Sequence, residues 1–332
     1  MSGVTHQKVV GDEAGMRLDR WFKSRYPGLA FGQLQKMLRK GHIRVEGKRA
    51  KADVRLAVGQ TVRVPPMGSD ADSRPADPRS ILPAADEDYI RSLVIHRDDS
   101  VLAINKPPGL AVQGGPGISR HVDGLLDGLR FGSDQRPRLV HRLDRETSGV
   151  LLLARTRLAA AALGKALKKR SAEKTYWALV YGVPRPRAGR VSSYLKAQPG
   201  QYEGRMMRTR HGDPDAQHAE SLYRVVEPVG SRLSWVALAP VTGRKHQLRV
   251  HMASIGHPIM GDPLYFEIQN YDAPGGIENR LHLHARFMSI PHPDGGRLEV
   301  AADLSQRMAK TWALFDFNAN RPDAEIADPE EA

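Results

Sequence analysis

The densest group of polar residues in the chain surrounds a single aspartate. It reads HRLDRETSG over residues 141–149 and directly precedes an apolar run, residues 150–154. Asp144 lies between Arg142 and Arg145, and nearby positive charge favours the ionised carboxylate, which can act as a nucleophile or a base. The following Thr-Ser-Gly predicts a sharp turn braced by hydroxyl and amide groups. A carboxylate in a polar turn is more often a cap or an ion-pair residue, so the pattern alone leaves both roles open.

A second polar group, TGRKHQLRVH, covers residues 242–251. Apolar residues at helical spacing predict a helix here, with Thr242 as a possible cap and Gly256 as its end; they are Leu248, Met252 and Ile255. Arg249 would project from the flank of this packed helix. It is either an ordinary surface or ion-pair residue, or a fixed guanidinium that partners a catalytic carboxylate.

The histidines do not form a metal-binding pattern. No pair has the i, i+4 spacing with an adjacent acid that a metalloprotease helix uses, so we expect no metal site. The residues considered are His246, His251, His257, His282 and His284. The chain has no cysteine, which excludes disulfides, thiolate-held clusters and a thiol nucleophile. It also has no glycine run with the spacing of a Walker loop or a dinucleotide fingerprint.

The elements that must position these groups form a domain that we place at residues 89–318. Strand-like runs, among them VLAINKP, GVLLLART, YWALVYG, SWVALAP and RLHLHARFMSI, outnumber the helical runs LAAAALGKALKK and KHQLRVHMASI. Strands often follow one another without an intervening helix. The pattern predicts an α+β domain with a mixed or mostly antiparallel sheet, flanked by helices and loops.

A separate basic module precedes this domain, at residues 15–64. It holds 13 Lys or Arg against three acids and so carries +10 of the chain's net charge of +13. Helices are predicted over 17–26 and 31–40, followed by strands around a turn at Gly47 and around Val62. Such one-sided charge indicates a polyanionic partner, most economically nucleic acid, although charges can also merely solvate a surface.

The remaining segments indicate a linker and a tail. Residues 65–88 hold five prolines and six acids and predict an extended tether, and residues 319–332 predict a disordered acidic tail. With 332 residues, 40% of them hydrophobic, the chain can bury two cores. No run reaches the about 18 apolar residues of a membrane span, and no signal peptide is recognisable, so we expect a cytoplasmic protein.

The basic module resembles the S4 RNA-binding domain, through RLDRWF, LQKMLRKGHIRVEGKRAK and GQTVRVP. The resemblance implies RNA contacts from the module, and the residues we assign to them are Arg17, Lys36, Arg39, Lys40, Arg44, Lys48 and Arg49. The larger domain resembles the RluA-type pseudouridine synthases, through HRLDRETSGVLLLART, EKTYWALVYG, VTGRKHQLRVHMASIGHPIMGDPLY and LHLHARFMSIPHP in that order. With AINKPPGLAVQGGPG, the resemblance is nearest to the RluC-like branch, which acts on large-subunit ribosomal RNA.

This family resemblance implies roles for four residues. Asp144 matches the essential aspartate of the family, Tyr176 the tyrosine that lies on the uracil, and Arg249 the arginine paired with the aspartate. Arg142 matches the arginine that enters the space left by the flipped base. Without the family, Tyr176 would be an ordinary strand aromatic.

The reaction implied is the isomerisation of uridine to pseudouridine in RNA. It breaks the C1′–N1 bond, joins C1′ to C5 and releases the C5 proton, so it needs no cofactor. Attack at C1′, a glycal route and addition to C6 all remain open. We expect a monomer with no membrane partner that acts on large-subunit ribosomal RNA, with transfer RNA as another possible substrate. The alternatives are a non-catalytic RNA-binding or assembly factor and a carboxylate-dependent hydrolase.

Overall fold

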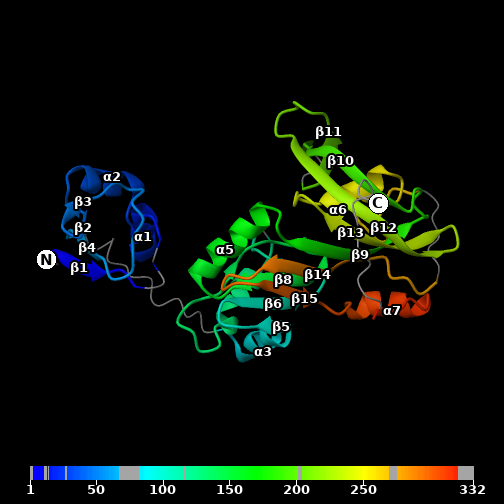
Figure 1. Cartoon of the computed structure of the whole chain (residues 1–332), viewed down its shortest axis with the longest axis horizontal. Helices are drawn as coiled ribbons and strands as arrows, with labels where there is room; N and C mark the ends of the chain where they lie inside the picture. The colour runs from blue at the N-terminus through cyan, green and yellow to red at the C-terminus, as the bar shows by residue number, and fades with distance from the viewer. Residues whose placement is uncertain are drawn as a thin grey trace. The chain divides into compact units, whose positions relative to one another are not determined.

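The computed structural model describes residues 3–10, 13, 15–26, 28–66, 82–115, 117–200, 204–268 and 275–320 (Figure 1). The chain divides into two compact units, Met1–Pro83 and Ala84–Ala332. Most of the expected linker and the expected tail from residue 321 lie outside the described residues. Within the described part, no helix has the length and apolar character needed to cross a membrane.

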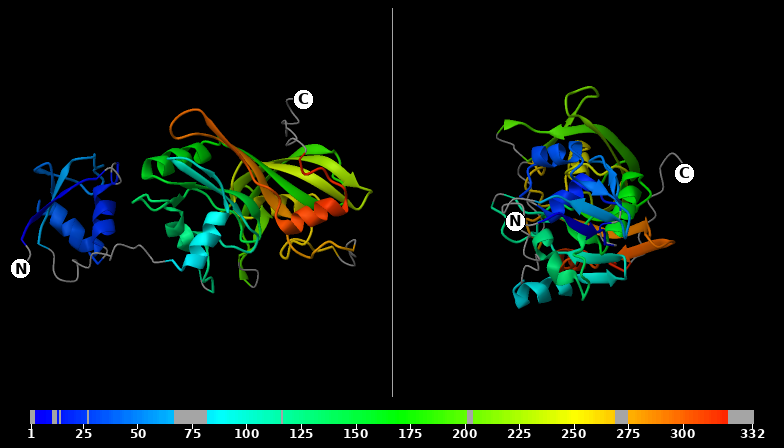
Figure 2. Two further views of the ribbon diagram at one scale, coloured as in Figure 1. Left: turned by 90° about the horizontal axis from the view of Figure 1, so that it is seen from below. Right: turned by 90° about the vertical axis from the view of Figure 1, so that its left-hand side faces the viewer.

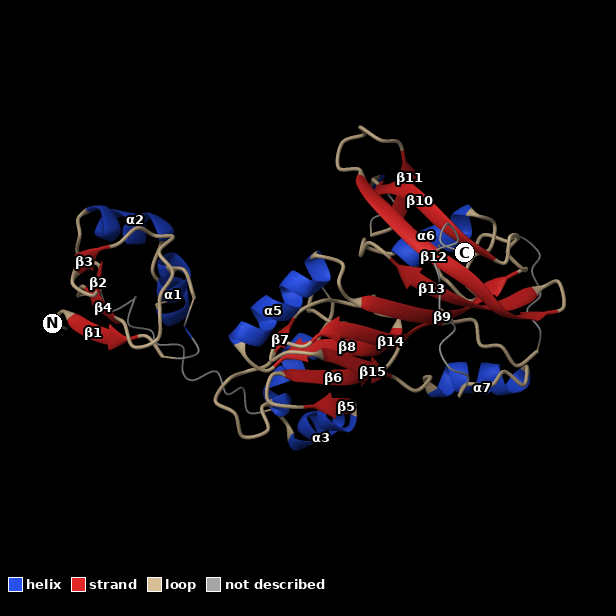
Figure 3. Ribbon diagram, viewed as in Figure 1, coloured by secondary structure: helices blue, strands red, loops and turns tan. Residues whose placement is uncertain are grey.

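The N-terminal unit packs two helices against a small antiparallel sheet (Figure 3). The helices are α1 (Leu18–Arg25) and α2 (Phe31–Arg39), and the strands are β1 (Thr5–Lys8), β2 (Arg44–Val45), β3 (Lys48–Arg49) and β4 (Thr61–Val64). The strand order is β1-β4-β2-β3. Both predicted helices are confirmed to within one residue at each end. Their apolar faces bury a core around Trp21, Phe22, Leu34 and Leu38, which leaves the charged faces outside.

The expected start of this unit at residue 15 was ten residues too late. Strand β1 pairs antiparallel with β4, with Thr5 opposite Val64. The sequence around β1 lacks the period-two apolar pattern of a strand, because it is an edge strand whose four side chains are exposed or half-buried. Backbone pairing rather than side-chain burial defines β1, and hydropathy does not detect such a strand.

The larger unit is built on an eleven-stranded sheet (Figure 2). The sheet is mixed and mostly antiparallel, as the sequence predicts. Its main path is β11-β10-β12-β13-β9-β14-β8-β6-β5, with β15 paired to β14 and β7 to β8. The strands are β5 (Val94–Arg97), β6 (Val101–Lys106), β7 (Arg138–Leu139), β8 (Ser148–Ala154), β9 (Glu173–Tyr181), β10 (Ala188–Ala197), β11 (Met206–Thr209), β12 (Gln217–Val229), β13 (Leu233–Pro240), β14 (Leu283–Pro291) and β15 (Arg297–Ala301).

Strand β14 joins the two halves of this sheet. One of its edges pairs antiparallel with β9, and the start of its other edge pairs in parallel with β8 through His284 opposite Ser148 and Ala285 opposite Gly149. Gly149 has φ +108°, and a Cβ on it would lie 2.1 Å from the carbonyl oxygen of Ala285. Glycine is therefore required here by both conformation and space. The joint begins four residues after Asp144.

Helices cover both faces of the sheet. Successive side chains of β9 (Glu173–Tyr181) contact different helices on the two faces. Ala178 and Val180 pack in the cluster that contains α6 (Gln247–Ser254), whereas Trp177 and Leu179 pack in the cluster that contains α7 (Gln306–Leu314). Successive strand residues point to opposite faces. Tyr176 therefore shares the face of α6, which carries Arg249.

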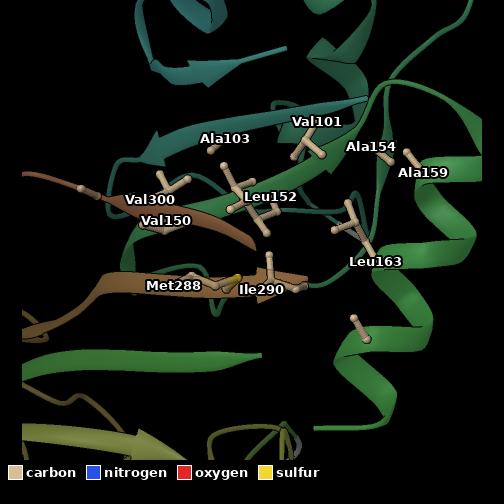
Figure 4. Close-up of a cluster of buried hydrophobic side chains, with 13 residues drawn as sticks. Val101, Ala103, Val150, Leu152, Ala154, Ala159, Leu163, Met288, Ile290 and Val300 are labelled. Carbon is tan, nitrogen blue, oxygen red and sulfur yellow. The ribbon is translucent and has the colours of Figure 1, made fainter. Parts of the chain in front are cut away.

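A third cluster lies at the first half of the sheet (Figure 4). Helix α5 (Arg157–Lys168) packs Ala159 and Leu163 against Val150 and Leu152 of β8. Thr156 caps this helix by accepting from the amide of Ala159. All seven residues of β8 are buried, so the strand that follows the Asp144 loop is fixed on both faces.

The larger unit begins before the expected residue 89. Helix α3 (Ala84–Ser92) occupies the end of the segment taken as a tether, and its Ile90 is fully buried. Acids dominate its first turn, where they are favourable at a helix N-terminus, and Glu87 pairs with Arg91 one turn later. The sequence did not predict this helix, because a short helix with a single buried residue has little hydrophobic periodicity. Its acidic residues also made the segment look like part of the linker. The remaining elements are α4 (Val122–Leu125) and the 3-10 helix η2 (Leu126–Leu129).

Candidate active site

The residues singled out in the larger domain meet in one pocket of about 340 Å³. The loop before β8 supplies Arg142 and Asp144, β9 supplies Tyr176, and α6 supplies Arg249. The turn from Pro240 to His246 closes the remaining wall. The fold thus brings together four residues that are up to 107 positions apart in the sequence, from Arg142 to Arg249.

The positive charge beside Asp144 comes from across the sheet rather than from its neighbours in sequence. Its Oδ2 lies 3.4 Å from Nη1 of Arg249. The expected contact between these two residues is therefore confirmed. Arg145, which we expected to favour the ionised carboxylate, instead donates from Nε to the carbonyl of Gly109 at 3.1 Å and lies 3.7 Å from Glu146.

Arg249 is held mainly by a second aspartate that the sequence analysis missed. Asp262 accepts from Nε and Nη2 of Arg249 at 2.8 and 2.7 Å, and its side chain is fully buried. It also accepts from the amides of Leu264 and Tyr265. Burial alone lowers the pKa of Arg249, but its hydrogen bonds to Asp262 and the negative charges of Asp262 and Asp144 outweigh burial, so the net pKa is raised. The bidentate pair fixes the guanidinium while Nη1 remains directed at Asp144.

The signal for Asp262 was present in the sequence. It lies in IMGDPLY, at the end of the segment that begins VTGRKHQLRVH, where a single acid follows a glycine among apolar residues. A buried acid of this kind is rarely tolerated without a cationic partner. The identity of that partner depends on a tertiary contact over 13 positions, which spacing alone does not give.

Helix α6 begins at Gln247, not at the expected Thr242. Thr242 instead donates from its hydroxyl to Oε1 of Gln247 at 2.6 Å and accepts from the amide of Glu220. The intervening turn ends at His246, whose φ of +53° is left-handed. The prediction of Thr242 as the helix cap was wrong. Its hydroxyl bonds to the Gln247 side chain and to the backbone of β12, and the N-cap position belongs to His246. Gly256, with φ +84°, follows the helix as expected.

His246 also lies close to Asp144, with its Nε2 3.8 Å from Oδ2. The sequence did not predict this contact. On the other side of the ring, Nδ1 lies 2.8 Å from the hydroxyl of Tyr265, which also accepts from the amide of Met206. The amide occupies one acceptor site of the hydroxyl, which favours donation of the hydroxyl proton to Nδ1 and a neutral ring with its proton on Nε2. Burial lowers the pKa of His246 to about 4. At neutral pH it is an uncharged ring facing Asp144.

Tyr176 presents the aromatic wall of the pocket. Burial raises the pKa of its hydroxyl, and the nearby charge of Asp144 raises it further. The phenol therefore stays protonated at physiological pH. Its ring lies among the α6-side cluster with Leu248 and Leu283, so its orientation is set by packing.

Lys106, at the end of β6, is hydrogen-bonded to the loop that carries Asp144. Its side chain is fully buried, and Nζ donates to the carbonyls of Pro107, Leu110 and Arg145 at 2.9, 2.9 and 3.0 Å. Burial lowers the pKa of Lys106 to about 7. The predicted bracing after Asp144 is present in part. The amide of Thr147 donates to the carbonyl of Asp144, whereas the hydroxyl of Ser148 pairs with Nδ1 of His284.

Other expected contact residues are exposed. Arg142 is exposed and lines the pocket. In the N-terminal unit the exposed cations are Lys36, Arg39, Lys40, Arg44, Lys48 and Arg49. Arg17 is also exposed, but its guanidinium pairs with Asp19 at 2.7 Å. Arg44 donates from Nε and Nη1 to the carbonyls of Gly41 and Gly47, so Arg17 and Arg44 are less available to a phosphate than the other five.

The remaining histidines have structural hydrogen bonds. His251 lies between the hydroxyls of Ser193 and Ser221, and His284 lies between the hydroxyl of Ser148 and the carbonyl of Ala302. In the described part of the chain, no three His, Asp or Glu side chains are grouped so that they could hold a metal ion.

The pocket thus places a carboxylate beside a fixed guanidinium, with an aromatic side chain in the same lining. The comparisons with known proteins identify the family. Residues 100–254 match the family model described as RNA pseudouridylate synthase.

Full-length relatives extend this match. The chain is 36% identical over 309 residues to ribosomal large subunit pseudouridine synthase C of Escherichia coli (strain K12), covering 89% of this chain and 92% of the relative. The protein of the same name from Vibrio cholerae serotype O1 is 35% identical over 303 residues, covering 90% and 92%. Two solved human structures are also similar.

Human RNA pseudouridylate synthase domain containing 4 has a TM-score of 0.59 and 27% identity, and covers 69% of this chain and 96% of its own. Human RNA pseudouridylate synthase domain containing 1 has a TM-score of 0.52 and 28% identity, and covers 65% and 86%. The chain belongs to the RNA pseudouridine synthase family, and it is an RNA-modifying isomerase.

Proposed function

We propose that this enzyme converts specific uridines of large-subunit ribosomal RNA to pseudouridine, with Asp144 as the reacting carboxylate. The names of the relatives support the substrate class. The observation that carries the assignment of Asp144 is its position in the pocket, one fifth exposed and 3.4 Å from a buried guanidinium. A bound uridine can reach this carboxylate, whereas Arg249 behind it is only 5% exposed.

Each pocket residue has a distinct task in this reaction. Arg249 orients the Asp144 carboxylate and balances its charge, and His246 places a neutral imidazole beside it. Tyr176 offers its ring to the uracil after the C1′–N1 bond breaks, so that the base can turn without leaving. The new bond joins C1′ to C5, and the C5 proton leaves to solvent. Nothing is oxidised or reduced.

The target base must be extruded before it can enter this pocket, which costs a few kcal/mol of unstacking in structured RNA. Arg142 is suited to offset that cost because it is exposed and lines the same pocket. We assign it to the space that the uridine vacates. The exposed cations of the N-terminal unit, an S4-like module, would supply the sequence-independent capture of RNA.

Among the described residues that line the pocket, Asp144 is the only carboxylate, so the hydrolase alternative finds no second one there. Retaining glycosidases need two carboxyl groups about 5 Å apart. Asp262 is fully buried against Arg249, and Glu146 is not among the residues that line the pocket. The geometry therefore supports isomerisation rather than hydrolysis.

The test uses large-subunit ribosomal RNA fragments that carry tritium at uridine C5. The full chain should release tritium to water while the RNA and its base content remain intact, and transfer RNA should release less. Asp144→Asn keeps the shape of the side chain but removes its charge, so release should fall below about 1% while RNA binding is retained. Asp99→Asn, which alters a fully exposed aspartate, is the matched control. Residual activity above that level in Asp144→Asn would remove Asp144 from the central role.

A further inference from the structure

A second hollow, of about 370 Å³, lies beside the active-site loop and is not used by the reaction described above. Its lining comes from α3, from the turn at Pro107–Ala111, from the segment at residues 117–120 and from Arg145. Most of this lining belongs to the segment AINKPPGLAVQGGPG, for which the isomerisation provides no task. The two pockets share no lining residue.

The peptide bond between Asp144 and Arg145 connects the two hollows. Asp144 lines the first and Arg145 lines the second. The second hollow thus begins one residue along the chain from the Asp144 carboxylate. An RNA strand that places its extruded uridine against Asp144 can place an adjacent nucleotide at the second hollow.

The second hollow offers an anion contact at one side. The Arg145 side chain is 66% exposed. Its contacts with other described residues, to Gly109 and Glu146, both run through Nε. The two terminal nitrogens and their four N–H groups are thus open to a ligand. A planar guanidinium with free terminal N–H groups suits a phosphate.

It offers a flat surface at the other side. The guanidinium of Arg120 stacks over the ring of Tyr89, 4.0 Å from its centroid, and is fixed at its edge by Asp86 at 2.6 Å. A base can stack on such an arginine–aromatic pair. The rings of Pro107 and Pro108 add an apolar wall, so both parts of a nucleotide find matching chemistry.

We propose that this second hollow binds the nucleotide adjacent to the target uridine in the same RNA strand. Its phosphate contacts Arg145, and its base stacks on the Arg120–Tyr89 pair. The site reads the neighbour of the target and so contributes to the choice of uridine. The proposal rests on the proposed function in one respect, that the substrate is an RNA strand with its uridine at Asp144.

The first test measures tritium release and RNA binding with the full chain. The substrates are one RNA and two derivatives in which the 5′ or the 3′ neighbour of the target is abasic. Tyr89→Ala should raise KM and Kd for the intact RNA by about tenfold, the size expected for the loss of one stacked base. The larger share of the loss should fall in KM rather than in kcat. With one of the two abasic RNAs, the variant and the unaltered enzyme should have the same Kd.

Two further variants separate charge from shape. Arg145→Lys keeps the positive charge but loses the planar fork, so it should weaken binding of all three RNAs alike, by a severalfold factor. Lys310→Ala removes an exposed cation from α7 and should leave KM and kcat unchanged. Equal losses for Lys310→Ala and Arg145→Lys would show a general charge effect and overturn the proposal.

A cross-linking experiment tests the proposal with the unaltered chain, so its result does not depend on whether a variant folds. Iodouridine placed at the 5′ neighbour, the 3′ neighbour or a distant position is irradiated in complex with the full chain. Cross-links should map to Tyr89 from one neighbour only. No cross-link to Tyr89 from either neighbour, or an unchanged penalty for Tyr89→Ala with both abasic RNAs, would overturn the proposal. So would saturable binding of a free mononucleotide that leaves the Kd for RNA unaltered.

The outcome is separable from that of the proposed function. If ribosomal fragments release no tritium, the substrate assignment fails, but the binding and cross-linking arms still report on the second hollow. If tritium is released normally and Tyr89 makes no difference to KM or Kd, only the second hollow is wrong.

Discussion

The buried pair between Arg249 and Asp262 should be strongly coupled in stability. Asp262→Asn leaves a guanidinium that is only 5% exposed without its bidentate partner. Removing one member of a buried pair typically costs about 3–5 kcal/mol. Asp144 remains 3.4 Å from Nη1 and compensates in part, so we expect about 3 kcal/mol. Arg249→Met leaves Asp262 with the amides of Leu264 and Tyr265, and we expect a similar loss.

The double variant removes both charges, so neither remains buried and unpaired. Its destabilisation should be no larger than that of either single variant, which gives a coupling energy of about 3 kcal/mol. Urea unfolding followed by tryptophan fluorescence measures it, because Trp177, Trp235 and Trp312 lie in the core of this unit. The matched control is Glu267→Gln, whose carboxylate pairs with Arg205 but is 69% exposed. It should cost less than about 1 kcal/mol.

Additive losses in the double variant, within about 0.5 kcal/mol, would refute this reasoning. They would mean that Arg249 and Asp262 act independently despite their hydrogen bonds. A control variant as damaging as Asp262→Asn would likewise show that burial does not set the cost.

Three other predictions follow from the same geometry. The pKa of Lys106 is lowered from 10.5 to about 7, so the unfolded state binds the extra proton between these pH values. The unaltered chain should therefore gain stability relative to Lys106→Met, by more than about 1 kcal/mol, from pH 7 to 10.5 in urea unfolding, and parallel profiles would contradict it. Gly149→Ala should cost at least about 3 kcal/mol in thermal unfolding, against about 1 for Gly256→Ala, whose added Cβ meets open space; equal costs would show that the clash is relieved. A fragment from residue 82 should keep slow tritium release but lose about three units of salt slope, if the N-terminal unit makes about four phosphate contacts, and an unchanged slope would exclude that capture role.

The sequence was sufficient for the residues that carry their own local signal. Asp144 stands in a polar turn before a buried strand, and the helix around Arg249 has apolar residues at helical spacing. Both helices of the N-terminal unit follow from the same periodicity. In each case, the residues that define the pattern are close in sequence, so spacing is enough to place them.

The missing parts depend on contacts that spacing does not contain. Asp262 and Tyr265 reach the site from a segment after α6, and their partners are set only by the tertiary fold. Lys106 sits at the end of an apolar strand and is buried because three carbonyls converge on it. Flanking charge was a poor guide for Asp144, because a side chain such as Arg145 can turn away from its neighbour.

The joint at β14 also determines when the enzyme becomes competent. Until Leu283–Pro291 is in place, Asp144 belongs to one half of the sheet, while Tyr176 and Arg249 belong to the other. The RNA-binding candidates of the N-terminal unit are translated before this strand. A growing chain can therefore acquire the ability to hold RNA well before it can modify a uridine. A chain that ends before β14 would hold these residues on two unconnected halves of the sheet, so the pairing of β14 is the step that assembles the pocket.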